Sequence, residues 1–252
     1  MSQLGIAAEA RSSRIARAVA DEVYRYERKF VSHRTAGGRL RVLIRSHPAG
    51  FREAYPPRYV NNVYLDSWNL GHYQAHLEGT GWRRKIRVRW YGELCAEQAA
   101  AVLELKIRSG QVGTKRRFDL GTFDASGGVD FERIRECLVG AELPADLKCE
   151  IDSMKPALLN RYRREYFVSL DGRLRLTVDG DQSFYEVGGG KNPDLVRWRC
   201  DGDEIIELKY AMPDEDAALQ AGQYFPFRLT RHSKYARGIS LIHSEPPQRY
   251  VL

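Results

Sequence analysis

Residues 83–91, with the sequence RRKIRVRWY, constrain the fold of this chain more than any other stretch. From Lys85 onward, basic residues alternate with the apolar residues Ile86, Val88 and Trp90. Alternation with a period of two, in a segment rich in β-branched and aromatic residues, indicates a β-strand with two chemically different faces. One face requires a hydrophobic core, while the other carries cations spread over only ~14 Å. Because like charges repel, this second face favours a polyanionic ligand.

The same alternation recurs along the chain. The expected strands are residues 23–32, 59–66, 82–91, 101–108, 114–120, 161–170, 173–179 and 204–210. Apolar residues at helical spacing predict helices at residues 12–22, 39–45, 68–77, 131–139, 213–220 and 231–242. Asp171 and Gly172 predict a hairpin turn. We expect a turn at residues 55–57 around its two prolines, and a short turn or helix at residues 154–160.

Composition places the chain among ordinary soluble globular proteins. It has 252 residues, of which 43% are hydrophobic, and a net charge of +7. The four cysteines are too widely spaced for a zinc site or a disulfide framework, which favours a reducing compartment. No apolar stretch approaches the ~20 residues that span a bilayer, and the N-terminus lacks the apolar region of a secretory signal. We therefore expect a cytoplasmic protein.

The polar faces of the predicted strands carry more basic than acidic residues. The acidic residues on them are Glu27, Glu104, Glu165, Asp179 and Glu207. One such strand is typical of a solvated face with cross-strand ion pairs of roughly 0.2–1 kcal/mol each. A long series of such strands cannot be explained in the same way, because all of their apolar faces must be buried. The apolar faces could meet in a sandwich with a cationic exterior, or helices could cover them from outside.

The helices predicted between the strands favour the second arrangement. In that arrangement the sheet would close as an antiparallel β-barrel of about eight strands with its charges inside, and sequence spacing alone leaves both arrangements open. The interior of such a barrel can hold one small ligand.

A set of short motifs follows in order over residues 22–240. They are RYERKF at 25–30, YVNNVYLD at 59–66, KIRVRWYG at 85–92, LELK at 103–106, NRYR at 160–163, RLRLTVD at 173–179, ELK at 207–209 and SKY at 233–235. In this order they resemble the VTC (vacuolar transporter chaperone) domain, the polyphosphate polymerase branch of the triphosphate tunnel metalloenzymes in the CYTH-like superfamily. The resemblance implies an α+β fold, with a closed antiparallel β-barrel of about eight strands, helices packed on the outside and a triphosphate lying inside. It also implies one domain over residues 1–252, with an N-terminal helix at 1–21 and a tunnel core at 22–243.

The resemblance also implies an activity. A polyphosphate polymerase transfers the terminal phosphoryl group of ATP to a growing inorganic polyphosphate chain inside a basic tunnel, with Mn²⁺ or Mg²⁺ as cofactor. A phosphate oxygen of the acceptor is the nucleophile, so no protein nucleophile is needed. The eukaryotic polymerases also carry an SPX domain and membrane spans, which this sequence lacks. Coupling to transport would therefore require a separate membrane partner protein.

One departure separates two enzymatic alternatives. The hydrolase branch begins its first strand with Glu-x-Glu-x-Lys, whereas this chain has Arg25 at the first position and keeps only Glu27 and Lys29. The loss of a carboxylate removes a candidate for binding metal or activating water. This favours a polymerase over a tunnel triphosphatase that hydrolyses inorganic triphosphate or a nucleoside triphosphate.

Arginine and lysine suit phosphate because arginine donates two hydrogen bonds to its oxygens and lysine offers a compact charge. The candidate catalytic residues are Lys29, Arg87, Arg89, Lys106, Arg163, Arg175 and Glu207. The candidate phosphate-binding residues are Lys29, Lys85, Arg87, Arg89, Lys106, Lys115, Arg161, Arg163, Arg175, Lys209 and Lys234. The candidate metal ligands are Glu207, which matches the family's metal position, and Glu27 and Asp179, since hard carboxylate oxygens suit Mn²⁺ and Mg²⁺.

A third alternative is a non-catalytic binder of polyphosphate or RNA. RNA binders interleave basic residues with exposed stacking aromatics. Here most aromatic residues are expected on the faces opposite the cations, which disfavours RNA, and no feature indicates DNA. Tyr59, Tyr64 and Tyr91 are accordingly expected to pack in the protein rather than to stack on nucleobases.

Overall fold

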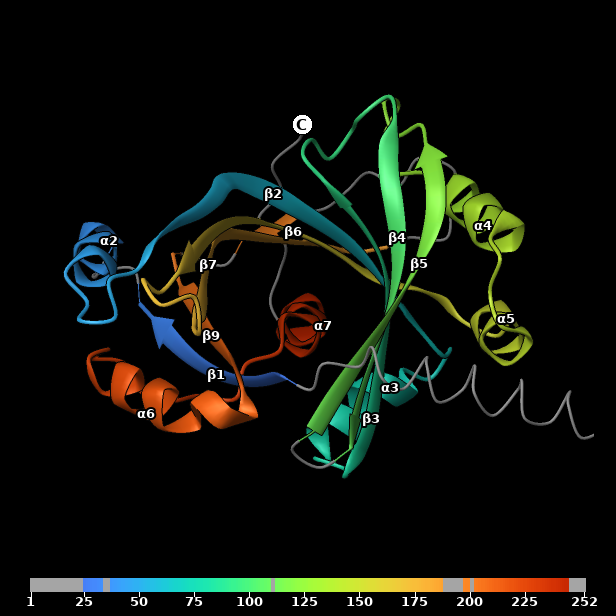
Figure 1. The fold of residues 1–252 in the computed structure, drawn as a ribbon. Helices are drawn as coiled ribbons and strands as arrows, with labels where there is room; N and C mark the ends of the chain where they lie inside the picture. The colour runs from blue at the N-terminus through green and yellow to red at the C-terminus, as the bar shows by residue number, and fades with distance from the viewer. Residues whose placement is uncertain (1–24, 34–36, 110–111, 188–196, 200–201, 245–252) are drawn as a thin grey trace, which may run out of the picture.

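The computed structural model of the protein describes residues 25–33, 37–109, 112–187, 197–199 and 202–244. The helix predicted within residues 1–21 lies outside these ranges. One antiparallel sheet forms the centre of the fold, with the strand order β1-β9-β7-β6-β2-β3-β4-β5 and β8 paired to β7 (Figure 1). The strands are β1 (Arg25–Ser32), β2 (Arg52–Asp66), β3 (Trp82–Tyr91), β4 (Ala99–Ser109), β5 (Val112–Phe123), β6 (Lys155–Val168), β7 (Arg175–Tyr185), β8 (Arg197–Arg199) and β9 (Glu204–Ala211).

All eight predicted strands are present, but two segments differ from the sequence-based expectation. Pro56 and Pro57 lie inside β2 rather than in a turn, at register shifts in its ladder with β6. Proline has no N–H to donate, so it is tolerated where a bulge interrupts the ladder. The expected turn or helix at residues 154–160 is instead the beginning of β6.

The sheet curls strongly, but the predicted closed barrel is not confirmed. β1 and β5 are the two ends of the hydrogen-bonded order, and no ladder joins them in the part of the chain that the structure describes. The two edge strands nevertheless approach each other. Lys106 of β4 reaches across to Glu27 of β1, with 3.3 Å between Nζ and Oε2. Side chains therefore bridge the gap that a barrel would close with backbone hydrogen bonds.

The helices lie around this sheet. They are α2 (Gly37–Arg45), α3 (Gly71–Leu77), α4 (Phe131–Gly140), α5 (Ala145–Asp152), the 3₁₀ turn η2 (Met212–Asp214), α6 (Glu215–Gln223) and α7 (Lys234–Ser244). The five helices predicted within the described ranges are present with shifted ends, and α5 was not predicted. Among the described helices, none has the length and apolar character required to cross a membrane.

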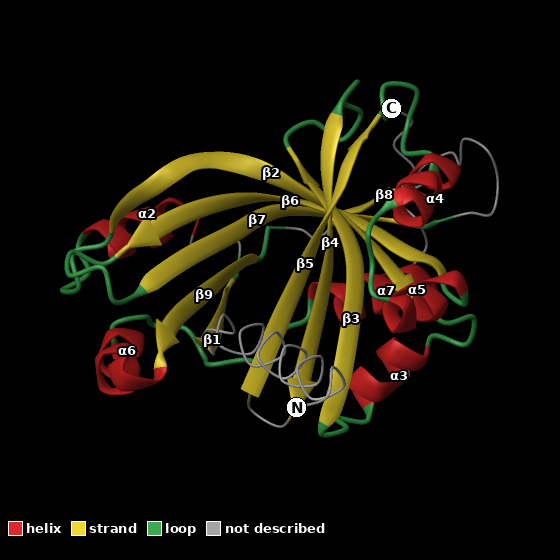
Figure 2. Cartoon of the chain, turned by 45° about the vertical axis from the view of Figure 1, so that its right-hand side comes forward, coloured by secondary structure: helices red, strands yellow, loops and turns green. Residues whose placement is uncertain are grey.

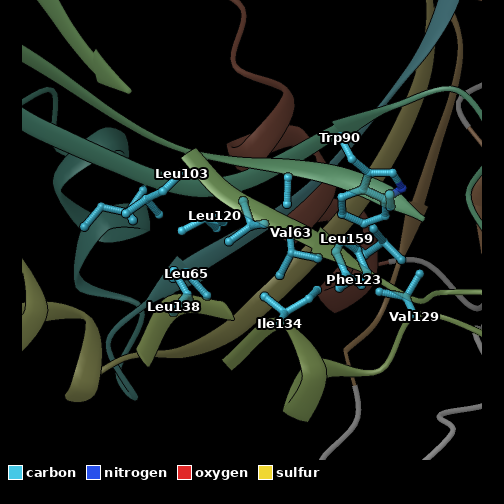
Figure 3. Packing of buried hydrophobic residues seen from close by; sticks show 14 of the residues in the cluster. Val63, Leu65, Trp90, Leu103, Leu120, Phe123, Val129, Ile134, Leu138 and Leu159 are labelled. Atoms are coloured by element: carbon cyan, nitrogen blue, oxygen red, sulfur yellow. The ribbon is translucent and has the colours of Figure 1, made fainter. Parts of the chain in front are cut away.

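Two hydrophobic clusters cover the convex face of the sheet, as the alternation predicts. In the first, the outward side chains of β2 to β5, including Trp90 and Leu103, pack with Ile134 of α4 (Figure 3), and Leu147 of α5 belongs to the same cluster. In the second, the outward residues of β6, β7 and β9 pack against α2 and α6. Figure 2 shows α2 and α6 at one end of the sheet and α4 and α5 at the other.

Helix α7 departs from the prediction that the helices lie outside. It lies within the curve of the sheet (Figure 1), where Tyr235 and Ile239 pack with Leu158 and Phe184 of the concave face. This part of the concave face is apolar, so it accepts the apolar face of a helix. Gly238 allows close approach, because a Cβ there would lie 2.5 Å from side-chain atoms of Leu158 and Phe184.

The close approach at Gly238 leads to a first prediction. We expect Gly238→Ala to lower the free energy of unfolding by about 1–3 kcal/mol, because the added methyl group overpacks the contact between α7 and the sheet. Gly140→Ala at the end of α4 is the matched control, since a Cβ there would meet nothing within 4 Å. Urea unfolding followed by circular dichroism compares the two variants. Equal stability of both would contradict the tight packing of α7.

Candidate functional site

Charged side chains from seven strands and from α7 gather on the concave face of the sheet. Ion pairs connect them into two clusters, which we name after the carboxylate at the centre of each. The Glu104 cluster consists of Glu104, Arg87, Arg89, Lys115 and Arg117. The Glu207 cluster consists of Glu207, Glu27, Asp179, Lys29, Lys106, Arg164, Lys209 and Lys234.

In the Glu104 cluster, one buried carboxylate of β4 contacts four cations from the two neighbouring strands, β3 and β5. The shortest distances to its oxygens are 2.6 Å from Arg87 and 2.9 Å from Arg117. Arg89 and Lys115 follow at 3.3 and 3.4 Å. Burial alone would raise the pKa of Glu104, but Arg87 and Arg89 hold it far below its usual range. The carboxylate is therefore ionised, and the cluster keeps a surplus of positive charge.

Glu207 of β9 is also surrounded by cations. Its oxygens lie 2.7 Å from Lys209 Nζ, 3.0 Å from Lys29 Nζ and 3.2 Å from Arg164 Nη2. Lys234 of α7 follows at 3.7 Å. Burial opposes ionisation, yet Lys209 and Lys29 keep the pKa of Glu207 well below its ordinary value. This carboxylate joins three strands and one helix.

Asp179 of β7 fixes two of these cations. Its fully buried carboxylate contacts Arg164 Nε and Lys234 Nζ, each at 2.5 Å. Both cations also lie over the ring of Tyr162, at 5.3 and 4.7 Å from its centroid. Burial raises the pKa of Asp179, but the attraction of Arg164 and Lys234 is stronger and lowers it overall. The N-terminus of α7 is thereby anchored to the sheet.

Glu27 of the edge strand β1 contacts Lys29 of its own strand at 3.0 Å and Lys106 of β4, next to the opposite edge, at 3.3 Å. Burial and the nearby Glu207 both raise the pKa of Glu27, but Lys29 and Lys106 lower it to about 2. Glu27 and Glu207 therefore both point at the ammonium group of Lys29.

Lys85 extends the cationic face toward α7. Its Nζ donates a hydrogen bond to Ser233 Oγ at 2.6 Å. Burial lowers the pKa of Lys85 well below its ordinary value, and the nearby Lys29 and Lys106 lower it further. An anion bound beside Lys85 would reverse this shift, because it would stabilise the protonated ammonium group.

Neutral side chains hold the arginines of β3 in place. Arg89 donates to Asn62 Oδ1 at 2.7 Å and to the Tyr162 hydroxyl at 3.1 Å. Arg87 donates to the Tyr64 hydroxyl at 3.1 Å. These partners fix the guanidinium groups before any ligand arrives, which lowers the cost of ordering them on binding.

Most of the sequence-predicted site residues come together on this face. They are Lys29, Lys85, Arg87, Arg89, Lys106, Lys115, Lys209 and Lys234, with the carboxylates Glu27, Asp179 and Glu207. Arg175 lies on the same face of β7 as Thr177 and Asp179, opposite Lys209 in the ladder, with an exposed side chain at the margin of the Glu207 cluster.

Arg161 and Arg163 lie elsewhere. Arg163 pairs with Glu165 at 2.7 Å, and Arg161 lies over the ring of Tyr59 at 3.9 Å. Both arginines are on the convex face of β6, so the sequence-based expectation that they join the other cations is wrong about their position. Arg164, which directly follows Arg163 on β6, points into the site instead.

The sequence held a usable signal for this assignment. Odd-numbered residues of β6 share a face with Leu159 and Phe167, which are both buried in the convex-face clusters. Tracing these two apolar residues would have placed Arg163 outside and Arg164 inside. The residues of this face that sequence reasoning did not name as site residues are Arg164, Glu104, Arg117, Asn62, Tyr64, Tyr162 and Ser233.

The expected separation of aromatic residues from cations is also wrong for several tyrosines. Tyr64 and Tyr162 hydrogen-bond to arginines of the site, so they lie on the concave face. Tyr91 and Tyr166 lie there too, each two residues beyond an arginine of the site on the same strand. Trp90, by contrast, is buried on the convex face as predicted.

The carboxylates of this face are the candidate metal ligands. The described residues include no group of three or more His, Cys, Asp or Glu side chains arranged to hold a metal ion. Asp179 contacts Arg164 and Lys234. Glu27 and Glu207 lie on either side of one ammonium group, that of Lys29, each at 3.0 Å, and each also contacts further cations. This pair fits the usual mode of Mg²⁺ binding, in which one or two carboxylates act together with substrate phosphates.

Comparison with known proteins places the chain in a family. The family model of the VTC domain matches residues 24–243. Two solved structures are similar: the PH1819 protein from Pyrococcus horikoshii OT3 (12% identity, 88% of this chain, 100% of that chain, TM-score 0.46) and a putative adenylate cyclase from Vibrio parahaemolyticus (10% identity, 86% and 99%, TM-score 0.47). No curated protein matches. Because the family model covers most of the sequence, this chain belongs to the VTC domain family.

Proposed function

We propose that this VTC domain is a metal-dependent polyphosphate polymerase. In this proposal it transfers the terminal phosphoryl group of ATP to a growing inorganic polyphosphate chain that lies along the concave face, and ADP is released. The acceptor is itself a phosphate, so the protein supplies positions and charges rather than a nucleophile.

The observation that carries the proposal is the charge surplus on the concave face. The two clusters join nine basic side chains to only four carboxylates. The cations repel one another, and the carboxylates relieve only part of that repulsion. A polyphosphate has about one negative charge per phosphate and would neutralise the remainder without any recognition of sequence or shape.

The two clusters suit different tasks. In the Glu104 cluster, Arg87 and Arg89 are fixed guanidinium groups that can donate paired hydrogen bonds to phosphate oxygens. In the Glu207 cluster, Lys29 and Lys209 are compact charges held beside two carboxylates. We assign phosphate binding to both clusters and the reacting phosphates to the Glu207 cluster.

A divalent cation, Mn²⁺ or Mg²⁺, belongs to this proposal. Glu27 and Glu207 would hold it together with phosphate oxygens, while Asp179 stays occupied with Arg164 and Lys234. When bound, such an ion neutralises the charge that develops on the leaving phosphate. Lys29, which contacts both carboxylates, would then shift toward the phosphates.

The direct test uses the purified protein with ATP and Mn²⁺ or Mg²⁺. We expect chains of inorganic polyphosphate, visible by gel electrophoresis, and ADP in an amount equal to the phosphoryl groups incorporated. Orthophosphate without polyphosphate would show a triphosphatase. Binding of polyphosphate without turnover under either metal would show a non-catalytic binder. Both outcomes would reject the polymerase.

Glu207→Gln tests the role of the central carboxylate. We expect polyphosphate synthesis to fall about 10- to 100-fold, because the variant loses a metal ligand and the group that positions Lys29 and Lys209. Binding of polyphosphate should remain, since the cations are unchanged. The melting temperature should fall without ligand and recover when polyphosphate is added, because phosphate replaces the missing negative charge.

Glu136→Gln is the matched control, because Glu136 is exposed on α4 on the convex side of the sheet. It should leave synthesis, binding and melting temperature unchanged. If Glu207→Gln synthesised polyphosphate at the rate of this control, the assignment of Glu207 would be wrong.

The lowered pKa of Lys115 predicts how the binding of polyphosphate depends on pH. Burial lowers the pKa of Lys115 to about 8; Glu104 opposes this shift, and Arg117 and Arg87 add to it. As the pH rises from 7 to 9, Lys115 loses its proton and attracts phosphate less. We expect polyphosphate affinity to weaken by about two- to fivefold from this group, as for one solvated ion pair.

Lys115→Arg keeps its charge over this range, so it should have a flatter pH profile than the wild type. Affinity can be measured at constant ionic strength by fluorescence anisotropy of labelled polyphosphate. Identical slopes for the two proteins would exclude Lys115 as the group responsible.

A further inference from the structure

Four residues at one end of the concave face form a group that the phosphate sites do not use. We name it the Tyr91 cluster; it consists of Tyr55, Arg58, Tyr91 and Tyr166. The guanidinium carbon of Arg58 lies 4.0 Å from the centroid of the Tyr91 ring and 5.2 Å from that of Tyr166. Arg58 Nε also donates to the Tyr166 hydroxyl at 3.0 Å. Tyr55 packs edge-on against Tyr166, with 5.9 Å between centroids.

The Tyr91 cluster continues the cationic face directly. On β3, Tyr91 is the next concave-face residue after Arg89, and on β6, Tyr166 is the next after Arg164. Arg58 of β2 is opposite Arg164 in the ladder between β2 and β6. One step between residues on the same face of a strand is ~7 Å. The aromatic rings therefore lie one step from the guanidinium groups that we assign to phosphate.

The tyrosines of this cluster differ from the other tyrosines of the face. Tyr64 and Tyr162 are 4% and 1% exposed and use their hydroxyls to hold arginines of the Glu104 cluster. In contrast, Tyr55 is 67% exposed, and Arg58 is exposed as well. Tyr91 and Tyr166 are half-buried. The cluster thus presents aromatic and guanidinium planes to a ligand.

Planes of this kind bind nucleobases. A base stacks on tyrosine rings and on arginine guanidinium groups, and such stacking tolerates any base because each has a π-face. The arginines one step away would bind the phosphates at the other end of the same nucleotide. We propose that the Tyr91 cluster is the nucleobase-binding site of this domain, which places the base of a nucleoside triphosphate here and its phosphates on the adjacent arginines.

This inference rests on the proposed function. A comparison of two ligands can nevertheless test the nucleobase site separately from the proposed function. ATP has a base and inorganic triphosphate has none. We expect Tyr91→Leu and Arg58→Ala each to weaken ATP binding by about tenfold, the scale of one lost stacking contact. Triphosphate binding should change by less than about twofold. Isothermal titration calorimetry with Mg²⁺ measures both affinities.

Tyr59→Leu is the matched control. It removes a similar stack, that of Arg161 on Tyr59, from the opposite face of β2. It should leave both affinities unchanged. An equal loss of ATP and triphosphate binding in Tyr91→Leu would overturn the inference, because the cluster would then act only by supporting the cations. Unchanged ATP binding in both variants would overturn it too. Wild-type protein that binds neither ligand would reject the proposed function and this inference together.

A measurement on the wild type avoids any dependence on how well the variants fold. Etheno-ATP has a fluorescent adenine analogue that acrylamide quenches in solution. We expect the bound base to be several-fold less accessible to acrylamide than the free base, because it is stacked between side chains. A bound base as accessible as free etheno-ATP would contradict a nucleobase site at the Tyr91 cluster.

Discussion

The charged concave face exists because buried carboxylates hold cations that would otherwise repel one another. Burying an ion costs roughly several kcal/mol of hydration free energy, and contacts with opposite charges recover part of that cost. Glu104, Asp179 and Glu207 each contact at least two cations, and each has a pKa held below its ordinary value. The carboxylates are outnumbered, so the face is assembled without being neutral. The proposed ligand, polyphosphate, would neutralise this remaining positive charge.

The rest of the fold serves this arrangement. The convex side of the same strands is covered by α2, α4, α5 and α6, so the sheet gains its stability on the side away from the charges. Its curvature brings β1 and β4 close enough for Glu27 to contact Lys106. Helix α7 then adds Lys234 to the Glu207 cluster from the concave side. The convex face supplies most of the packing, and the concave face carries the two charged clusters beside the smaller apolar contact with α7.

Period-two alternation predicted the strands and most of the cations, because alternation is a local property of the chain. It failed on β6, where arginines occupy both faces and the convex face is marked by only two apolar residues eight positions apart, Leu159 and Phe167. The position of α7 and the gap between β1 and β5 were also beyond local reasoning, since both depend on contacts between residues far apart in the sequence. Tyr91 was expected to pack because most aromatic residues were expected opposite the cations, yet it is two residues beyond Arg89 on β3 and therefore shares the face of that arginine.

The same ion pairs bear on the choice between transfer and hydrolysis. A general base works best when its pKa lies near the working pH. All four carboxylates of the site have lowered pKa values, that of Glu27 to about 2. They are thus weak bases for activating water. An acceptor phosphate is already ionised at neutral pH and needs no base, only cations that bring it close to the donor. For the proposed function, a face rich in cations whose carboxylates are weak bases is therefore an argument for a polymerase rather than a triphosphatase.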